Sequence, residues 1–170
     1  MHLKWLSLLL ALSLLGVLFG GCATVAKQAP LKTLRSARFV TASDGDLLFT
    51  MEWSETGGTY RFSSPELLQE LTVTVTDGKI LASYKGVETE VTDEFCARIL
   101  PLYCALHAFR SSNAEVGKQG EQSYLRTTLD GDTFLMYYDS DSGVFTRLEW
   151  AGNSGSGGLD ILSCTESNSE

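Results

Sequence analysis

The sequence predicts an α+β domain that is mostly β, with an antiparallel sheet and one helical segment. Beyond the N-terminal leader, run after run of residues alternates between apolar and polar side chains. Glycine-containing turns separate these runs at the spacing of hairpins. A single stretch, Asp93 to Arg110, has apolar residues three and four apart, as in a helix. Because no helix separates neighbouring strands, we expect the sheet to be antiparallel.

The N-terminus has the composition of an export signal. A short basic start, Met1 to Lys4, precedes an apolar run from Trp5 to Phe19. The sequence Leu18-Phe19-Gly20-Gly21-Cys22 resembles the lipobox of bacterial lipoproteins, although Phe19 stands where leucine is usual. This resemblance implies that residues 1–21 are a signal peptide, removed before Cys22, and that the sulfur of Cys22 carries fatty acyl groups.

Two alternatives for the N-terminus stay open. The apolar run can be extended from Trp5 to Ala26, which is roughly 33 Å of helix and long enough for an uncleaved signal anchor. Helix-weakening Gly16 and Gly20 and the abrupt change at Lys27 argue against that anchor. Ordinary cleaved secretion is the other alternative. In each case the body is exported, and we expect a membrane-anchored lipoprotein on the extracytoplasmic side, with the choice of leaflet open.

The charge of the body excludes several partners. Lys4 is the only charged residue before Cys22, so 12 basic and 21 acidic side chains follow it and give a charge near −9. Such a surface repels nucleic acid and anionic lipid headgroups, so membrane attachment should come from the N-terminus. We expect a monomer with residues 22–36 as a lipidated, solvated tether, 37–164 as a single domain and 165–170 as a frayed tail.

The expected order of elements is six strands, the helical segment, and three or four strands. Leu47 to Ser54 alternates most clearly, and Gly57-Gly58 turns it into the run around Tyr60 and Phe62. Further alternating runs follow at Leu71 to Val75, Ile80 to Tyr84 and Val87 to Val91.

The helical segment contains Pro101, which should kink it, split it into two pieces, or mark its start. Thr92 or Asp93 is placed to cap it. After it, strands are expected at Tyr124 to Leu129, Thr133 to Tyr138 and Val144 to Trp150. Gly152 to Gly158 is expected as a flexible loop and Leu159 to Leu162 as an edge strand.

Between Arg38 and Trp150 the chain resembles small Firmicutes lipoproteins of the LolA/LprG-like superfamily, lipoprotein carriers and lipid-binding proteins. The similar segments are Tyr60 to Glu66, Leu71 to Val75, Asp77-Gly78-Lys79 and Ser83 to Gly86, followed by the helix and a second block of hairpins. The resemblance implies an unclosed half-barrel wrapped over a helix, with an apolar concave face. Candidate ligand-binding residues on that face are Phe49, Met51, Trp53, Tyr60, Phe62, Val73, Tyr84, Met136 and Tyr138; alternatively they are simply core.

The sequence contains little that indicates a catalytic or metal-binding site. His107 is the only histidine after Cys22, there is no G-x-S-x-G or S-x-x-K motif, and Asp139 to Gly143 fits a turn better than a calcium loop. Cys96, Cys104 and Cys164 lack C-x-x-C spacing, and their pairing stays open; on one continuous helix Cys96 and Cys104 would be about 12 Å apart, too far for a disulfide. No enzyme activity, metal or cofactor is expected.

We therefore expect a non-catalytic envelope lipoprotein whose domain binds an acyl chain or another hydrophobic ligand. The alternative is an interaction or assembly module with a fully packed core and an acidic surface that meets a protein partner.

Overall fold

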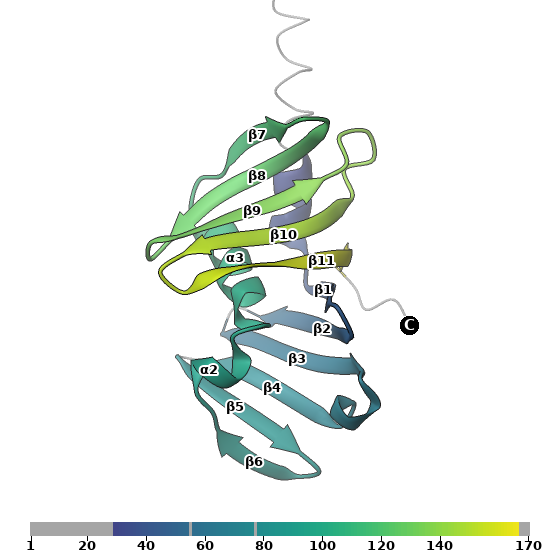
Figure 1. Ribbon diagram of the computed structural model, residues 1–170, viewed down its shortest axis with the longest axis vertical. Helices are drawn as coiled ribbons and strands as arrows, with labels where there is room; N and C mark the ends of the chain where they lie inside the picture. The colour runs from purple at the N-terminus through teal and green to yellow at the C-terminus, as the bar shows by residue number, and fades with distance from the viewer. Residues whose placement is uncertain (1–28, 55, 77, 167–170) are drawn as a thin grey trace, which may run out of the picture.

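One antiparallel sheet runs through the whole domain. The computed structural model describes residues 29–54, 56–76 and 78–166, and its eleven strands lie in the order β6-β5-β4-β3-β2-β1-β11-β10-β9-β8-β7 (Figure 1). The sheet is curved and does not close, because β6 and β7 are its two free edges. This confirms the predicted fold class, a mostly β domain with an unclosed, antiparallel half-barrel.

The first half of the sheet is a continuous meander. Residues of the predicted alternating runs form β2 to β6, and β1 precedes them. Their bounds are β1 Phe39–Asp44, β2 Leu47–Ser54, β3 Gly57–Ser64, β4 Leu71–Thr76, β5 Lys79–Tyr84 and β6 Val87–Glu90, with a short 3-10 helix, η1 Glu66–Leu68, between β3 and β4.

Tight turns connect these hairpins. Between β5 and β6, Lys85 and Gly86 both have positive φ, at 51° and 81°. Positive φ at both central residues is the signature of a type I′ turn, whose twist matches that of the flanking strands. Glycine at the second position meets this requirement without a Cβ penalty.

The helical segment is split in two. It consists of α2, Asp93–Cys96, and α3, Leu100–Ser111, with Pro101 in the first turn of α3, where no intrahelical donor is needed. Of the alternatives that Pro101 left open, the structure shows two helices, with the break at residues 97–99 and Pro101 near the start of the second. Thr92 occupies the N-cap position of α2, but its side chain makes no capping hydrogen bond.

The sheet order determines the path of these helices. Because β6 and β7 are opposite edges, the segment between them must cross the sheet. It crosses on one face (Figure 1), where α3 buries Leu102, Ala105, Leu106 and Phe109. The buried side chains of α3 therefore join the core that the two halves of the sheet share.

The second half contains five strands, one more than the maximum predicted. They are β7 Glu115–Gln119, β8 Gln122–Leu129, β9 Asp132–Tyr138, β10 Phe145–Gly152 and β11 Gly155–Thr165. β7 escapes prediction because none of its residues is buried, so it has no apolar alternation.

Strand β11 corrects two predictions. The expected loop at Gly152–Gly158 is instead mostly strand, since Gly157 pairs with Trp150 and Gly158 with Glu149. A Cβ at Gly157 would come within 2.4 Å of the Trp150 ring, so this glycine makes room for an aromatic neighbour. Residues Leu159–Leu162 do not form an edge strand, because β11 lies between β1 and β10.

The ends of the folded domain also differ from the prediction. Thr165, expected in the frayed tail, pairs with Phe39, and its carbonyl accepts a hydrogen bond from the Arg38 amide at 2.8 Å. Residues 29–36, expected as solvated tether, form a helix whose Leu34 is completely buried. Apolar burial of Leu34 therefore outweighs the solvation of its polar neighbours. The predicted signal peptide and residues 22–28 lie outside the described residues.

Two arginines join this N-terminal helix to α3. Arg35 donates from Nε to the Phe109 carbonyl at 2.9 Å and from Nη2 to the Ser112 carbonyl at 2.8 Å. Arg110 in turn donates from Nε to the Arg35 carbonyl at 3.2 Å and from Nη2 to the Ala37 carbonyl. Each guanidinium thus satisfies carbonyls at the C-terminal end of the other helix, where a cation is favourable.

The central position of β11 generates a stability prediction. Leu159 is 1% exposed and Leu162, on the same strand, is 55% exposed. We expect Leu159→Ala to lower the free energy of unfolding by about 2–5 kcal/mol through lost apolar burial and a cavity. The matched control Leu162→Ala should change it by less than about 0.5 kcal/mol. Urea unfolding curves measure both, and similar values for the two variants would contradict the central placement of β11.

Candidate functional site

The inner face of the sheet, where ligand-binding residues were predicted, is packed. Phe49, Met51, Tyr60, Val73 and Met136 have no exposed surface, and Phe62 and Tyr138 are also buried. Of the remaining two candidates, Trp53 is half-buried against the core, and Tyr84 near the β6 edge is 39% exposed. The structure therefore brings seven of the nine candidates into one core cluster.

Aromatic packing and one hydrogen bond hold this cluster against the helices. The Phe49 ring lies 5.8 Å from that of Tyr60 and 6.0 Å from that of Phe62, both tilted. The Tyr60 hydroxyl donates to the Ile99 carbonyl at 3.1 Å, just before α3 begins. Burial raises the pKa of Tyr60 well above its ordinary value, so this phenol remains a neutral donor. These contacts are typical of a structural core.

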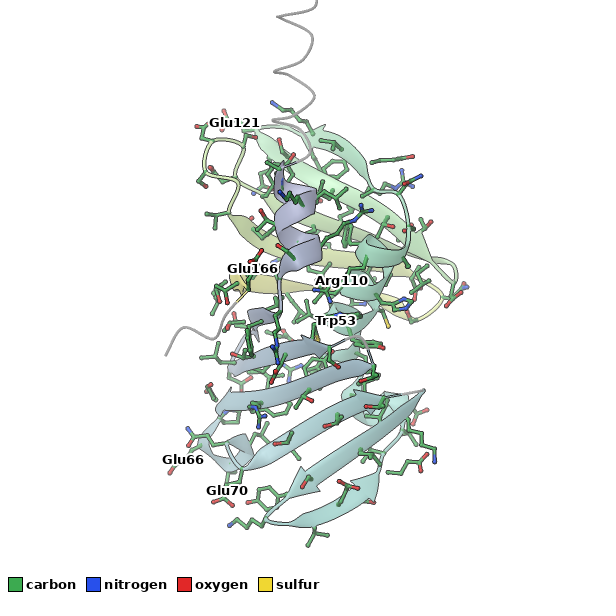
Figure 2. All side chains as sticks on the ribbon, turned by 180° about the vertical axis from the view of Figure 1, so that it is seen from behind. Trp53, Glu66, Glu70, Arg110, Glu121 and Glu166 are labelled. Carbon is green, nitrogen blue, oxygen red and sulfur yellow. The ribbon has the colours of Figure 1, made fainter. Side chains whose placement is uncertain are left out.

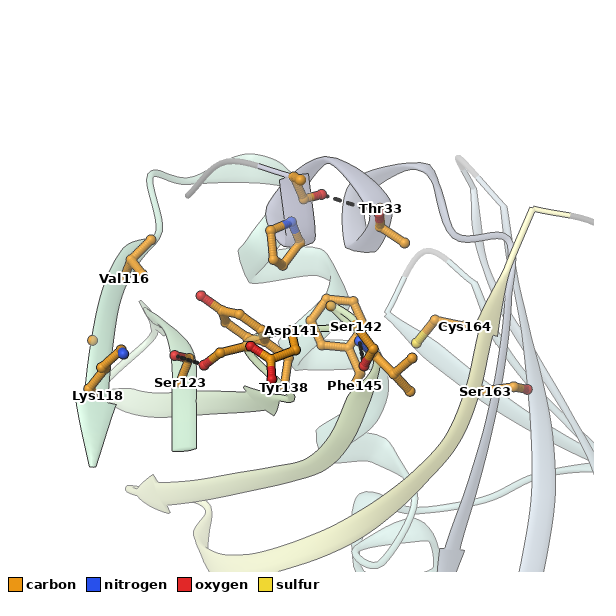
Figure 3. A pocket seen from close by; sticks show the side chains of 16 residues that line it. Thr33, Val116, Lys118, Ser123, Tyr138, Asp141, Ser142, Phe145, Ser163 and Cys164 are labelled. Carbon is orange, nitrogen blue, oxygen red and sulfur yellow. Dashed lines mark hydrogen bonds between the residues drawn. The ribbon is translucent and has the colours of Figure 1, made fainter. Parts of the chain in front are cut away.

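A cavity of about 810 Å³ lies beside Tyr138, beneath the N-terminal helix (Figure 3). We call it the helix pocket. The start of that helix, strands β7 and β8, the β9–β10 turn and the ends of β10 and β11 surround it. Its apolar lining residues are Pro30, Val116, Tyr138, Val144, Phe145 and Cys164. Its polar lining residues include Thr33, Lys118, Ser123, Ser140, Asp141 and Ser142.

The apolar part of the helix pocket is preformed. The rings of Tyr138 and Phe145 are both buried and meet edge to face, with centroids 6.1 Å apart. Val116 and Val144, in contrast, are 43% and 55% exposed. The pocket thus combines a fixed aromatic wall with two exposed aliphatic side chains.

The β9–β10 turn supplies the polar side of the helix pocket. Asp139 Oδ1 accepts hydrogen bonds from the Asp141 amide at 3.1 Å, the Ser142 amide at 2.7 Å and the Ser142 hydroxyl at 2.8 Å. The bonds from Ser142 lower the pKa of Asp139. The Asp139–Gly143 segment is therefore a turn, as predicted, and its first carboxylate is used to order it.

A hydroxyl pair fixes that turn to the sheet. Ser123 Oγ on β8 lies 2.7 Å from Ser140 Oγ in the turn, and Ser123 is buried (Figure 3). The side chains of Asp141 and Ser142, labelled in the same view, come from this ordered turn. The polar wall is consequently held by the scaffold and does not depend on a ligand for its shape.

Most residues of the helix pocket were missed in the sequence. Among the predicted candidates, Tyr138 alone lines it. Thr33 and Pro30 belong to a segment expected to be tether, and Val116 belongs to the unpredicted strand β7. The proximity of these segments depends on the pairing of β1 with β11 and on the crossing of the helices, for which no short-range sequence pattern exists.

The residues considered for catalysis or metal binding are not brought together. His107 is exposed on α3, 6.3 Å between ring centroids from both Trp53 and Tyr103. Cys96 is buried, and Cys104 and Cys164 are half-buried. Within the described ranges, no group of three or more His, Cys, Asp or Glu side chains has the geometry to hold a metal ion.

A second, smaller cavity of about 460 Å³ lies at the other end of the N-terminal helix. We call it the arginine pocket, because Arg35, Arg38 and Arg110 line it together with Trp53. Figure 2 shows Arg110 beside Trp53 below that helix. Sequence reasoning missed this cluster because Arg110 is distant in the chain from the other two arginines.

Comparisons with known proteins add no family. No protein-family model matches the chain, and no curated protein matches its sequence. As for membrane spans, no helix within residues 29–54, 56–76 and 78–166 combines the length and apolar character needed to cross a bilayer.

Cys164, in the wall of the helix pocket, allows a chemical test of the site. Burial raises its pKa to about 12. Near pH 8 its thiolate fraction should be about a thousandfold lower than that of an exposed cysteine with a pKa near 8.5. We expect iodoacetamide to label Cys164 correspondingly slowly in the folded protein and rapidly in urea, as measured by peptide mass spectrometry.

The raised pKa of Cys164 also makes the stability of the fold depend on pH. The unfolded thiol ionises at a lower pH than the buried one. The free energy of unfolding is therefore unaffected by this ionisation below about pH 8.5 and falls as the pH rises from there toward the folded-state pKa. Equal labelling rates in the folded and urea-unfolded protein would contradict the burial of this wall.

Proposed function

We propose that this protein is an exported lipoprotein, anchored through Cys22, whose domain binds an acyl chain or a similar hydrophobic group without catalysing a reaction. The observation that carries the ligand-binding part is the helix pocket, a cavity of about 810 Å³ with a preformed aromatic wall. That volume lies in the range of pockets for small molecules, which is about 300–1,000 Å³.

The chemistry of the helix pocket favours an amphipathic ligand. Pro30, Phe145 and the exposed Val144 offer apolar surface. Lys118 and Asp141 line the same cavity and provide charged groups for a polar head. Such a division, mostly apolar with a few placed polar groups, is typical of sites that orient a ligand by one end.

The position of the helix pocket supports uptake from a bilayer. Its wall includes Ala29 and Pro30, and Ala29 follows Cys22 by seven residues, a span of at most roughly 25 Å. An acylated Cys22 would keep the pocket close to the membrane surface, where apolar ligands are available. The resemblance to LolA/LprG-like carriers supports the same function, with the ligand beneath the N-terminal helix, beside Tyr138, and not among the packed candidates such as Phe49 and Met51.

An interaction module is the second candidate. Its support is the packed inner face together with the open edge β6, whose four residues are all exposed and whose Val87 is 71% exposed. A free edge with unpaired backbone groups is a template for a partner strand. Glu88 and Glu90 on that edge would select a basic partner.

Filling the helix pocket tests the first candidate. Thr33 and its neighbour Lys32 are both exposed, but only Thr33 lines the pocket. We expect Thr33→Trp to weaken binding of a fluorescent fatty acid by the full chain at least about tenfold through steric exclusion. The control Lys32→Trp should bind as the wild type does. A wild-type chain that binds no fatty acid, or equal binding by both variants, would favour the interaction module.

The anchor has its own test. We expect the mature protein isolated from its host to begin at Cys22, with the mass of a diacylglyceryl group on sulfur, and to fractionate with membranes. Cys22→Ser should abolish the added mass and release the protein from the membrane, because two or more acyl chains are needed for stable attachment. Mature protein that starts at Met1, or that carries an unmodified Cys22, contradicts the lipoprotein assignment.

A further inference from the structure

The arginine pocket concentrates positive charge in an acidic protein. Its lining comes from the end of the N-terminal helix, the residues just before β1, the end of β2 and α3, and it includes three of the chain's 13 basic residues. The whole chain has a net charge of −8, whereas three positively charged guanidinium groups lie together in this pocket.

The hydrogen bonds of two of the arginines are only partly satisfied. Arg35 and Arg110 each use Nε and Nη2 on backbone carbonyls of the opposite helix. Nη1 of Arg110 is buried and has no hydrogen-bond partner among the described residues. Since a guanidinium carries five N–H donors, each of these arginines keeps donors that the described protein atoms do not use.

The charge is also incompletely balanced. Arg38 pairs with Glu52, with Nη2 and Oε1 2.8 Å apart, and remains 61% exposed. Arg35 and Arg110 contact neutral carbonyls, and neither forms an ion pair in the part of the chain that the structure describes. The helix ends contribute about half a negative charge each, so about one positive charge is left uncompensated.

The Trp53 ring completes the wall of the arginine pocket. The Arg110 guanidinium carbon lies 4.3 Å from its centroid, a cation–π contact, and Tyr103 stacks on it at 5.1 Å. These contacts hold Arg110 in place without neutralising it. Partial burial lowers the pKa of Arg110, so a nearby anion would relieve the cost of keeping it charged.

We propose that the arginine pocket binds a phosphate group, held by Arg38 and by the unused donors and uncompensated charge of Arg35 and Arg110. Guanidinium groups match the oxygens of phosphate, and charge-assisted hydrogen bonds of this kind are stronger than neutral ones. The cavity of about 460 Å³ admits a phosphate or a small phosphorylated headgroup. The proposal is independent of the helix pocket and of its ligand.

The test uses two substitutions with opposite expected effects. Arg38→Gln removes the exposed guanidinium and leaves intact the hydrogen bonds that Arg35 and Arg110 donate to backbone carbonyls. It should weaken phosphate binding about tenfold. Glu52→Gln removes the carboxylate that competes for Arg38, so it should strengthen binding about threefold. Arg126→Gln, at an exposed position on β8 outside the pocket lining, is the matched control for the loss of one charge.

The measurement is isothermal titration calorimetry on the full chain in neutral detergent micelles at low ionic strength, with thermal melts to verify folding of each variant. One arm uses inorganic phosphate and the other a short-chain phosphatidylglycerol. The expected pattern with inorganic phosphate supports a free phosphate ligand, and the same pattern with phosphatidylglycerol alone supports a lipid headgroup. Absence of binding in both arms, equal losses in Arg38→Gln and Arg126→Gln, or no gain in Glu52→Gln overturns the proposal.

Discussion

The pairing of β1 with β11 is the constraint on which the rest of the fold depends. Each half of the sheet is a meander of local hairpins, and this single antiparallel pair joins the two halves. Because it places the ends of the folded domain at the centre of the sheet, β6 and β7 become the opposite edges. The intervening chain must then cross the inner face, and α3 fills the space in which a half-barrel could otherwise hold a ligand.

The same constraint positions both pockets. Strand β1 follows directly on the N-terminal helix, so the place of β1 in the sheet determines where that helix lies. Hydrogen bonds from Arg35 and Arg110 to backbone carbonyls of the opposite helix then fix it to α3. Ala29, Pro30 and Thr33 of this helix line the helix pocket, and its last residues, together with Ala37 and Arg38 after it, line the arginine pocket. One short helix therefore forms a wall of two chemically different cavities.

The sequence contained the information for local structure and lacked it for long-range placement. Alternation in β2 and the turn at Gly86 depend on neighbouring residues, so period and turn chemistry predicted them. The glycines before Leu159 suggested a loop, whereas Gly157 makes room for Trp150 on the paired strand, a neighbour that the sequence does not show. Of the pocket residues, Tyr138 was found through its strand, whereas Thr33 and Arg110 acquire their roles only from elements that meet in three dimensions.

The distance in sequence between β1 and β11 has a consequence for biogenesis. Phe39 pairs with Thr165, near opposite ends of the chain, so the two halves cannot join until the last strand is present. High contact order slows folding and leaves the inner apolar surface uncovered in the meantime. The sheet can therefore be completed only after β11 has been made, and until then the meander β1 to β6 has no partner for the outer edge of β1.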